Sequence, residues 1–268
     1  MIIVTLTTIP CRVEYLQRVI DNILNQSVKP DRIILYVPRE YEKRSLGKVD
    51  FNNLPHGCDI IYCNQDYGPA TKILPALQEY KDQDVSLIYC DDDRIYEKNW
   101  IKRLTEKSKQ YPRDCIIDEG YNMDFVLFKL WQSKHRIKYK LLRFLSLGLY
   151  APKRKMKNRE HHDIGEGFGG VLVKPDFFPP EVFDIPDILW SVDDTWLSGM
   201  MHKNGINIRK TDRARKERSR SVNITNDEPL NLYVYKGHNR EGAISLCVKY
   251  FIDNYRIWEQ YKDLCNLK

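Results

Sequence analysis

Apolar and polar positions follow two different periods through the first 130 residues of the chain. Short apolar runs bounded by turn or charged residues predict strands, over residues 2–9, 32–38, 58–63 and 85–90. Apolar positions three and four residues apart predict helices over 13–26 and from about 69 to 80. In the first of these helices they form one face: Leu16, Val19, Ile20, Ile23 and Leu24. This alternation predicts an α/β fold with a mainly parallel, Rossmann-like sheet and helices on both faces.

The second half of the chain loses this rhythm. Residues 129–160 hold eleven Lys or Arg and a single acid, and we interpret them as a basic insertion. Order resumes with a Gly-rich turn and strand in the segment GEGFGGVLV. We then expect a helix that begins at Asp193 or Asp194 and ends before Gly205, and a last helix in the latter half of 235–258.

The chain shows no internal repeat or low-complexity linker that would divide it. We therefore expect one domain over 1–268, in which 1–128 form a first half, 129–160 the insertion and 161–268 a second half. In open parallel sheets, ligands bind beyond the carboxyl ends of the strands. Three polar segments follow such ends: 7–12, 64–72 and 91–93.

Three aspartates, Asp91, Asp92 and Asp93, directly follow the apolar run LIYC. Like charges repel and Asp is poorly suited to a strand interior, so the triplet is costly unless a cation lies against it. Carboxylates two residues apart can reach one hard divalent cation that also takes phosphate oxygens. This suits a nucleoside diphosphate. The alternative is a polar turn with three solvated carboxylates, and the triplet alone does not separate the two.

Two Gly-containing segments add candidate contacts. In DYGPATK, Gly68 and Pro69 begin the predicted helix, whose free N–H groups favour anions, and Lys72 lies one turn further on. The alternative is a plain turn with Lys72 in solvent. The glycines of GFGG, 167–170, allow a ligand or another backbone to approach closely, or they form a bulge.

Asp193 and Asp194 begin a predicted helix, where Asp is a common cap. The functional alternative is a general base that takes a proton from an acceptor hydroxyl. In that case the flanking Trp190 and Trp196 would stack on a sugar. Among the histidines, His238 in the turn KGHNRE is the better candidate for a ligand.

Composition and charge bound the class of protein. A net charge of +6 favours anionic partners, namely phosphates, nucleic acid or a membrane surface. Seven cysteines without paired spacing fit a reducing compartment. The N-terminus reads as a strand and not as a signal peptide, and no stretch approaches the ~20 apolar residues that cross a bilayer. We expect a cytoplasmic protein, soluble or peripheral at the cytoplasmic face of the membrane.

The basic insertion allows two interpretations. Its Lys and Arg residues flank the apolar segment LLRFLSLGLY, 141–150, so it could lie on an anionic membrane and meet a lipid-linked acceptor. Alternatively, it is a solvated loop that covers the acceptor side. Binding to anionic vesicles would separate the two.

Taken in order, the segments TLTTIP, DYGPATK, YCDDDRIY, EGFGGVLV, VDDTWLSG and GHNRE resemble those of GT-A-type nucleotide-sugar glycosyltransferases, in particular family 2-like enzymes of bacteria and large viruses that add sugars to surface glycans. The resemblance covers most of the chain except 129–160. It implies a GT-A fold and a glycosyltransferase of hexosyltransferase type.

The resemblance also implies site residues. Asp91 and Asp93 would bind a divalent metal, Mn²⁺ or Mg²⁺, and His238 would complete the metal site. The nucleotide-sugar donor would contact a larger set: Thr7, Thr8, Ile9, Pro10, Arg12, Asp66, Lys72, Asp91, Asp92, Gly169, Gly170 and Arg240. Asp194 stands at the position of the catalytic base of inverting members, and Asp193 replaces the more usual Glu, so either residue could be the base.

The implied reaction is a single displacement with inversion. A sugar would pass from a nucleoside diphosphate, with a UDP-sugar as the first candidate, to a hydroxyl of a glycan, lipid-linked or protein acceptor. One rival is a sugar-1-phosphate nucleotidyltransferase, but TLTTIPCR has no glycine for the phosphate loop that such an enzyme needs. The other rival is a nucleic-acid-binding protein that uses the basic runs. The acidic edge would repel its phosphates, so we expect no specific nucleic acid partner.

Overall fold

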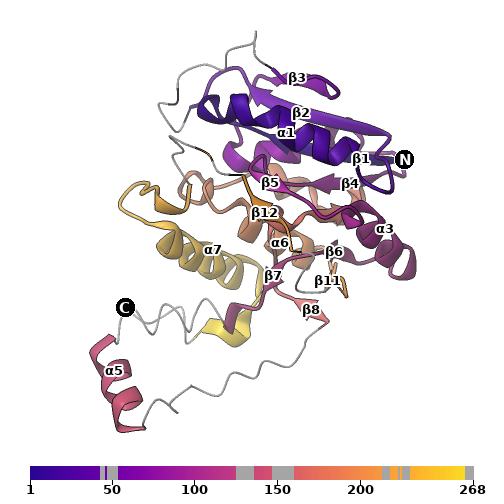
Figure 1. Cartoon of the computed structure of the whole chain (residues 1–268). Coiled ribbons are helices and arrows are strands. Elements are labelled where there is room, and N and C mark those ends of the chain that lie inside the picture. Colours follow the sequence, from indigo (N-terminus) through magenta and orange to yellow (C-terminus); the bar gives the residue numbers. More distant parts are fainter. Residues whose placement is uncertain are drawn as a thin grey trace.

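The computed structural model describes residues 1–42, 46, 54–124, 136–146, 160–212, 218–222, 224 and 230–262, and Figure 1 shows its elements. At its centre lies an eight-stranded sheet with the order β3-β2-β1-β4-β10-β6-β11-β8. Its strands are β1 (Ile2–Thr7), β2 (Arg32–Pro38), β3 (Asp59–Cys63), β4 (Ser86–Tyr89), β6 (Cys115–Ile117), β8 (His161–His162), β10 (Val171–Val173) and β11 (Ile208–Lys210). Two small antiparallel sheets pair β5 (Arg94–Ile95) with β12 (Arg220–Ser221) and β7 (Gly120–Tyr121) with β9 (Ile164–Gly165).

The direction of the strands confirms the predicted mainly parallel sheet. Strand β1 pairs in parallel with β2 and β4, β2 with β3, and β6 with β11. Strand β10 runs antiparallel between β4 and β6, and β8 antiparallel to β11. The parallel strands therefore end at one edge, which carries the segments after β1, β3 and β4.

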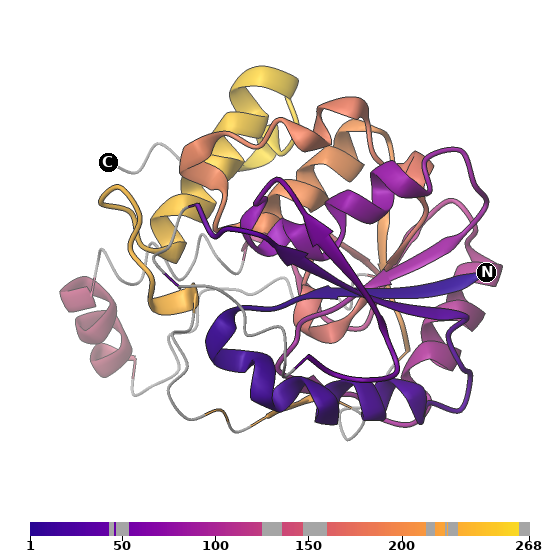
Figure 2. The same ribbon diagram turned by 90° about the horizontal axis from the view of Figure 1, so that it is seen from above.

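The helices other than α5 cover both faces of the sheet. The bounds of the helices are α1 (Val13–Leu24), α2 (Leu74–Glu79), α3 (Trp100–Gln110), α5 (Arg136–Leu145), α6 (Asp193–Lys203) and α7 (Arg240–Tyr255). Successive strand residues face opposite sides: Val4 packs with α1 and α3, and Ile3 packs with α2, α6 and α7. Figure 2 shows the sheet between these two layers. Burial on both faces explains why the central strands β1, β2 and β4 are mainly apolar runs.

Two details of the predicted helices are wrong. The helix expected at 69–80 is a 3-10 turn, η3 (Gly68–Lys72), followed by the short α2, with a break at Ile73. Pro75 has no backbone N–H and is tolerated only in the first turn, so one helix cannot run through it. Leu24, expected on the buried face of α1, is 37% exposed because the helix ends there.

The helices expected after Asp193 and near the C-terminus are confirmed as α6 and α7. Of the basic insertion, only α5 with Ser146, and Glu160, lie within the described residues, and the division into halves remains a prediction. No helix in the described part of the chain is long and apolar enough to span a bilayer.

Candidate functional site

A cavity of about 480 Å³ opens at the carboxyl edge of the parallel strands. Most of the predicted site residues line it: Thr7, Thr8, Ile9, Arg12, Asp66, Lys72, Asp91, Asp92, Asp93, Asp193, Asp194 and Arg240. Its lining does not include Pro10, Gly169, Gly170 or His238. The structure thus brings the segments after β1, β3 and β4 together with the first residues of α6 and α7. The volume of the cavity falls within the range of small-molecule sites.

The middle aspartate of the triplet, Asp92, points to the loop after β1. Thr8 Oγ1 donates to its Oδ2 at 2.7 Å, and Arg12 Nη1 donates to its Oδ1 at 2.6 Å. Both carboxylate oxygens are therefore engaged, and burial raises the pKa of Asp92 despite the neighbouring guanidinium. Asp92 holds the loops after β1 and β4 against each other, so its direct role is to position the cavity wall.

Asp66 has a comparable role on the other side of the cavity. Its Oδ1 accepts from the backbone N–H of Gly68 at 2.7 Å, and its Oδ2 accepts from that of Glu42 at 3.0 Å. It fixes the turn that leads into η3, and so the position of Lys72.

Lys72 connects the two acidic motifs. Its side chain is buried, with a residue exposure of 3%, so the interpretation of Lys72 as a solvent-facing residue is wrong. Its Nζ lies 2.8 Å from Asp91 Oδ1, 2.9 Å from Asp193 Oδ2 and 3.4 Å from Asp194 Oδ1. Burial opposes the charge of Lys72, but the three carboxylates raise its pKa well above the usual value. In return, the ammonium outweighs the effect of burial on Asp91 and lowers the pKa of that carboxyl.

Asp93 is less well compensated. Its buried Oδ1 makes no hydrogen bond within the described part of the chain, and its nearest cations are Arg94 Nε at 3.3 Å and Arg12 Nη1 at 3.5 Å. Burial, with the charges of Asp91 and Asp92, raises the pKa of Asp93 to about 6. A buried carboxylate oxygen without a hydrogen bond, beside a second carboxylate, is the oxygen set that hard divalent cations take. Asp91 and Asp93 therefore fit the implied metal.

His238 does not join these two aspartates. It closes a tight hairpin in which its backbone exchanges hydrogen bonds of 2.9 Å with Tyr235. Among the described residues, no three His, Cys, Asp or Glu side chains gather as a metal site. Arg240, two residues further on, does reach the acidic centre: it begins α7, and its Nη2 lies 4.0 Å from Asp194 Oδ2.

Asp193 and Asp194 form the first turn of α6 and are buried. The cap position belongs to Val192, which makes no side-chain cap, so the interpretation of these residues as a cap is wrong. Asp194 Oδ1 accepts from the backbone N–H of Gly167 at 3.1 Å. Burial, with the charges of Asp193 and Asp91, raises the pKa of Asp194 to about 6 against the opposing effect of Lys72. A carboxylate of this kind can exchange a proton near neutral pH.

The Gly-rich turn packs against the protein itself. A Cβ on Gly167 would lie 2.2 Å from Lys72 Nζ, and one on Gly169 would lie 2.5 Å from the Cβ of Glu119. Gly170 packs in the same way on Trp100. Glu119 and Trp100 therefore occupy the space next to Gly169 and Gly170 that the prediction of donor contacts requires. The cavity is lined instead by the residue before the first glycine and by the residue between the first two glycines.

Glu166 and Phe168 are those cavity residues, and sequence reasoning missed both. Burial, with the charges of Asp194 and Glu119, raises the pKa of Glu166 to about 7. Arg94 lies over the ring of Phe168, with 4.6 Å from its Cζ to the ring centroid. An acid directly before GFGG was the available signal for Glu166.

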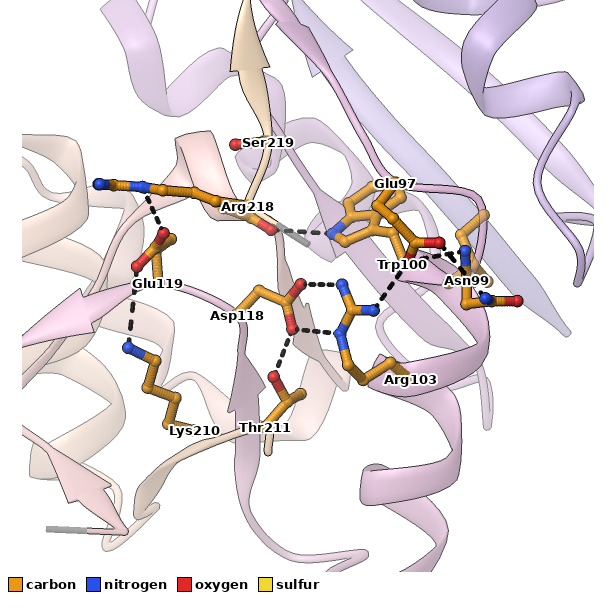
Figure 3. A network of polar contacts seen from close by, with 12 residues as sticks. Glu97, Asn99, Trp100, Arg103, Asp118, Glu119, Lys210, Thr211, Arg218 and Ser219 are labelled. Atoms are coloured by element: carbon orange, nitrogen blue, oxygen red, sulfur yellow. Dashed lines mark hydrogen bonds and ion pairs between the residues drawn. The ribbon is translucent and has the colours of Figure 1, made fainter. Parts of the chain in front are cut away.

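A second acidic network lies next to this turn in the fold, and Figure 3 shows its polar contacts. Asp118 follows β6 and accepts two hydrogen bonds from Arg103, at 3.1 and 2.6 Å, and a third from Thr211. Its neighbour Glu119 pairs with Arg218 Nε at 2.8 Å. Trp100 Nε1 donates to the carbonyl of Gly169 at 2.8 Å. This network holds the turn in place, and the acids that follow the short apolar run CII were its signal in the sequence.

The two tryptophans near α6 differ. Trp196 is fully buried and donates from Nε1 to the carbonyl of Val182 at 2.8 Å, so the expectation that it stacks on a sugar is wrong. Trp190 lines the cavity. Tyr233 and Tyr235 meet its ring edge-on, with centroids 5.9 and 5.6 Å away. An aromatic wall therefore borders the cavity beside Asp194.

Comparisons with known proteins add a family. A search of curated proteins gives no match. Among solved structures, the chain is similar to the glucosyl-3-phosphoglycerate synthase of Mycobacterium tuberculosis in complex with Mn²⁺, UDP-glucose and phosphoglyceric acid, with 13% identity, 94% of this chain and 79% of that chain covered, and a TM-score of 0.49. It is also similar to a mannosyltransferase of Pyrobaculum calidifontis in complex with GDP-mannose and Mn²⁺, with 12% identity, 78% and 54% covered, and a TM-score of 0.45. The family model described as glycosyl transferase family 2 matches residues 3–176, more than half of the chain. The chain therefore belongs to glycosyltransferase family 2 and is a glycosyltransferase.

Proposed function

We propose that this glycosyltransferase is metal-dependent and transfers a sugar, with inversion, from a nucleoside diphosphate sugar to a hydroxyl of a glycan, lipid-linked or protein acceptor. A UDP-sugar is the first donor to test. One observation carries the proposal: Lys72 holds Asp91 and the Asp193–Asp194 pair around one cavity, within 3.4 Å of its ammonium. A metal-binding carboxylate and a base candidate thus face the same space.

The donor would lie along the strand edge. Its nucleoside would lie against the loop after β1, between Thr8 and Asp66, and its diphosphate near Lys72 and Arg12. Asp91 and Asp93 would hold a Mn²⁺ or Mg²⁺ ion, which when bound supplies positive charge to stabilise the departing diphosphate. These groups all line the cavity.

Asp194 would serve as the general base. It takes the proton of the acceptor hydroxyl, whose oxygen forms a bond to the anomeric carbon while the bond from that carbon to the diphosphate oxygen breaks. The bonding electrons leave with the nucleoside diphosphate. The N–H of Gly167 fixes the carboxylate, and its pKa of about 6 leaves it mostly ionised at neutral pH. Asp193, at 2.9 Å from Lys72, would keep that lysine in position.

The decisive experiment combines turnover and pH. With Mn²⁺ and a panel of nucleotide sugars, Asp194→Asn should lower kcat by about 10³-fold while donor binding by calorimetry is retained. In the wild type, kcat should fall as the pH drops below about 6, because a protonated Asp194 cannot accept the proton. Removal of the metal by a chelator should abolish turnover, and NMR of the product should show the inverted anomer.

Asp84→Asn is the matched control, because Asp84 is an exposed carboxylate in an ion pair with Lys174, 2.8 Å away. It should leave kcat and its pH dependence unchanged. An Asp194→Asn enzyme with the kcat and acid limb of the wild type would show that another group is the base.

A further inference from the structure

Helix α5, within the basic insertion, exposes an apolar face. Four of its large apolar side chains are open to solvent: Ile137 is 85% exposed, Leu141 56%, Phe144 80% and Leu145 69%. They stand at positions i, i+4, i+7 and i+8 of the helix, so they form one stripe. In Figure 1, α5 stands apart from the sheet and its covering helices. Exposed apolar stripes of this kind mark an interaction surface.

The charge of the same helix is entirely positive. Its sequence, RIKYKLLRFL, holds four basic residues and no acid. Among them, Lys140 and Arg143 are exposed. On the helical wheel Lys140 borders the apolar stripe next to Phe144, and Arg143 lies on the opposite, polar face. A helix with one apolar stripe and only positive charges is complementary to a surface that offers both acyl chains and negative charge.

We propose that α5 binds the surface of a membrane rich in anionic lipid, with Ile137, Leu141, Phe144 and Leu145 inserted among the acyl chains and Lys140 and Arg143 at the headgroups. The helix lies in the plane of the membrane. A ten-residue helix is only about 15 Å long, so this stripe alone buries too little for a stable protein dimer, which requires about 1,200 Å² or more. A second copy of the chain would also bring like charges together.

The experiment is co-sedimentation of the full chain with phosphatidylcholine vesicles, made with and without phosphatidylglycerol. The wild type should bind the anionic vesicles and not the neutral ones, and added salt should weaken the binding. Ile137→Glu with Phe144→Glu should reduce the partition coefficient about tenfold or more. Lys140→Gln and Arg143→Gln should each reduce it about fivefold.

Leu232→Glu is the matched control, because Leu232 is a similarly exposed apolar residue, 74% open, outside α5. It should bind vesicles like the wild type. The proposal is overturned if the wild type does not sediment, or if the Ile137 and Phe144 substitutions leave sedimentation unchanged. A lower melting temperature of that double variant would overturn it as well, since the stripe would then pack on the protein. So would binding of random duplex DNA at physiological salt that depends on Lys140 and Arg143 while vesicle binding does not.

Discussion

Two acidic segments follow strands β4 and β6, on either side of β10, and they have opposite surroundings. After β6, Asp118 accepts three hydrogen bonds, and its two carboxylate oxygens are both used by Arg103 and Thr211. After β4, Asp93 keeps a buried oxygen that makes no hydrogen bond in the described chain. The sequence pattern is the same in both places, an apolar run followed by adjacent acids.

The two acids differ in how many hydrogen-bond partners each of them has. A buried carboxylate with all its partners stabilises the fold around it, whereas one without enough partners costs free energy that a bound cation can recover. Asp118 therefore supports the Gly-rich turn, whereas we propose that Asp93 binds the metal. In this proposal, the acid after β6 contributes to stability and the acid after β4 contributes to metal binding.

The largest effect that tests this division is expected at Asp93. Asp93→Asn should lower kcat/KM about 10³-fold, because the metal loses a charged ligand and the departing diphosphate its stabilisation. The same change should stabilise the metal-free protein by up to about 2–3 kcal/mol at neutral pH, since the pKa of Asp93 is raised to about 6 from its ordinary value near 4. Urea unfolding with a chelator present measures this gain.

The stability gained from Asp93→Asn should depend on pH. A raised acid pKa makes the charged form costly in the folded state, so the cost is absent below pH ~4, grows between ~4 and about 6, and is complete above it. The gain from Asp93→Asn should therefore vanish in acid. An Asn variant that is less stable than the wild type at pH 7 would show that Asp93 is part of the support instead.

Asp118 should behave in the opposite way. Asp118→Ala leaves Arg103 without the carboxylate that takes two of its hydrogen bonds, which should cost about 3 kcal/mol and lower the melting temperature by roughly 10 °C. The kcat of the folded fraction should stay within about threefold of the wild type. Asp84→Ala, in an exposed ion pair, is the control and should change neither value.

Much of this fold can be predicted from the sequence because the pattern of each strand and helix is visible within a short segment. The strands β1 to β4 are continuous apolar runs, and the acids that follow them had to lie at one edge once the strands were parallel. Asp91 and Lys72 were candidates before the structure because their segments follow such strands. Asp194 was a candidate because it begins a predicted helix and because of the resemblance to GT-A enzymes. Strands of two or three residues, such as β5, β7 and β12, are too short to show any period.

The partners of each residue could not be predicted in the same way. Lys72 and Asp194 are separated by 122 positions, and nothing periodic in either segment says that α6 packs on η3. The full burial of Trp196 depends on its neighbours in α7, above all Phe251. Likewise, Asp93 and Asp118 follow similar apolar runs, and only the long-range contacts with Arg103 and Thr211 distinguish them.

Two glycines of one turn allow a finer test. Gly167→Ala places a Cβ 2.2 Å from Lys72 Nζ, the movable end of a side chain, so the lysine should shift and kcat/KM should fall about tenfold with little change in stability. Gly169→Ala places a Cβ 2.7 Å from the backbone N of Glu119, which cannot move easily, and should cost about 1–3 kcal/mol of stability. Melting temperature and kcat/KM should be measured on both variants. Gly167→Ala should mainly lower kcat/KM, and Gly169→Ala should mainly lower the melting temperature. If both variants lose activity and stability to the same extent, the two glycines do not have separate roles.

The smallest effect is expected at His238. Its backbone hydrogen bonds with Tyr235 survive the change to Ala, and the residue lies outside the cavity lining, so His238→Ala should alter kcat/KM by less than about threefold. The concentration of Mn²⁺ that gives half-maximal activity is the sharper measure. Loss of a true ligand to the metal would raise it by at least about tenfold, the size of effect that even outer-shell partners of a metal have. Metal binding would be assigned to the acids after β4 if His238→Ala leaves this Mn²⁺ concentration unchanged and Asp93→Asn no longer responds to Mn²⁺.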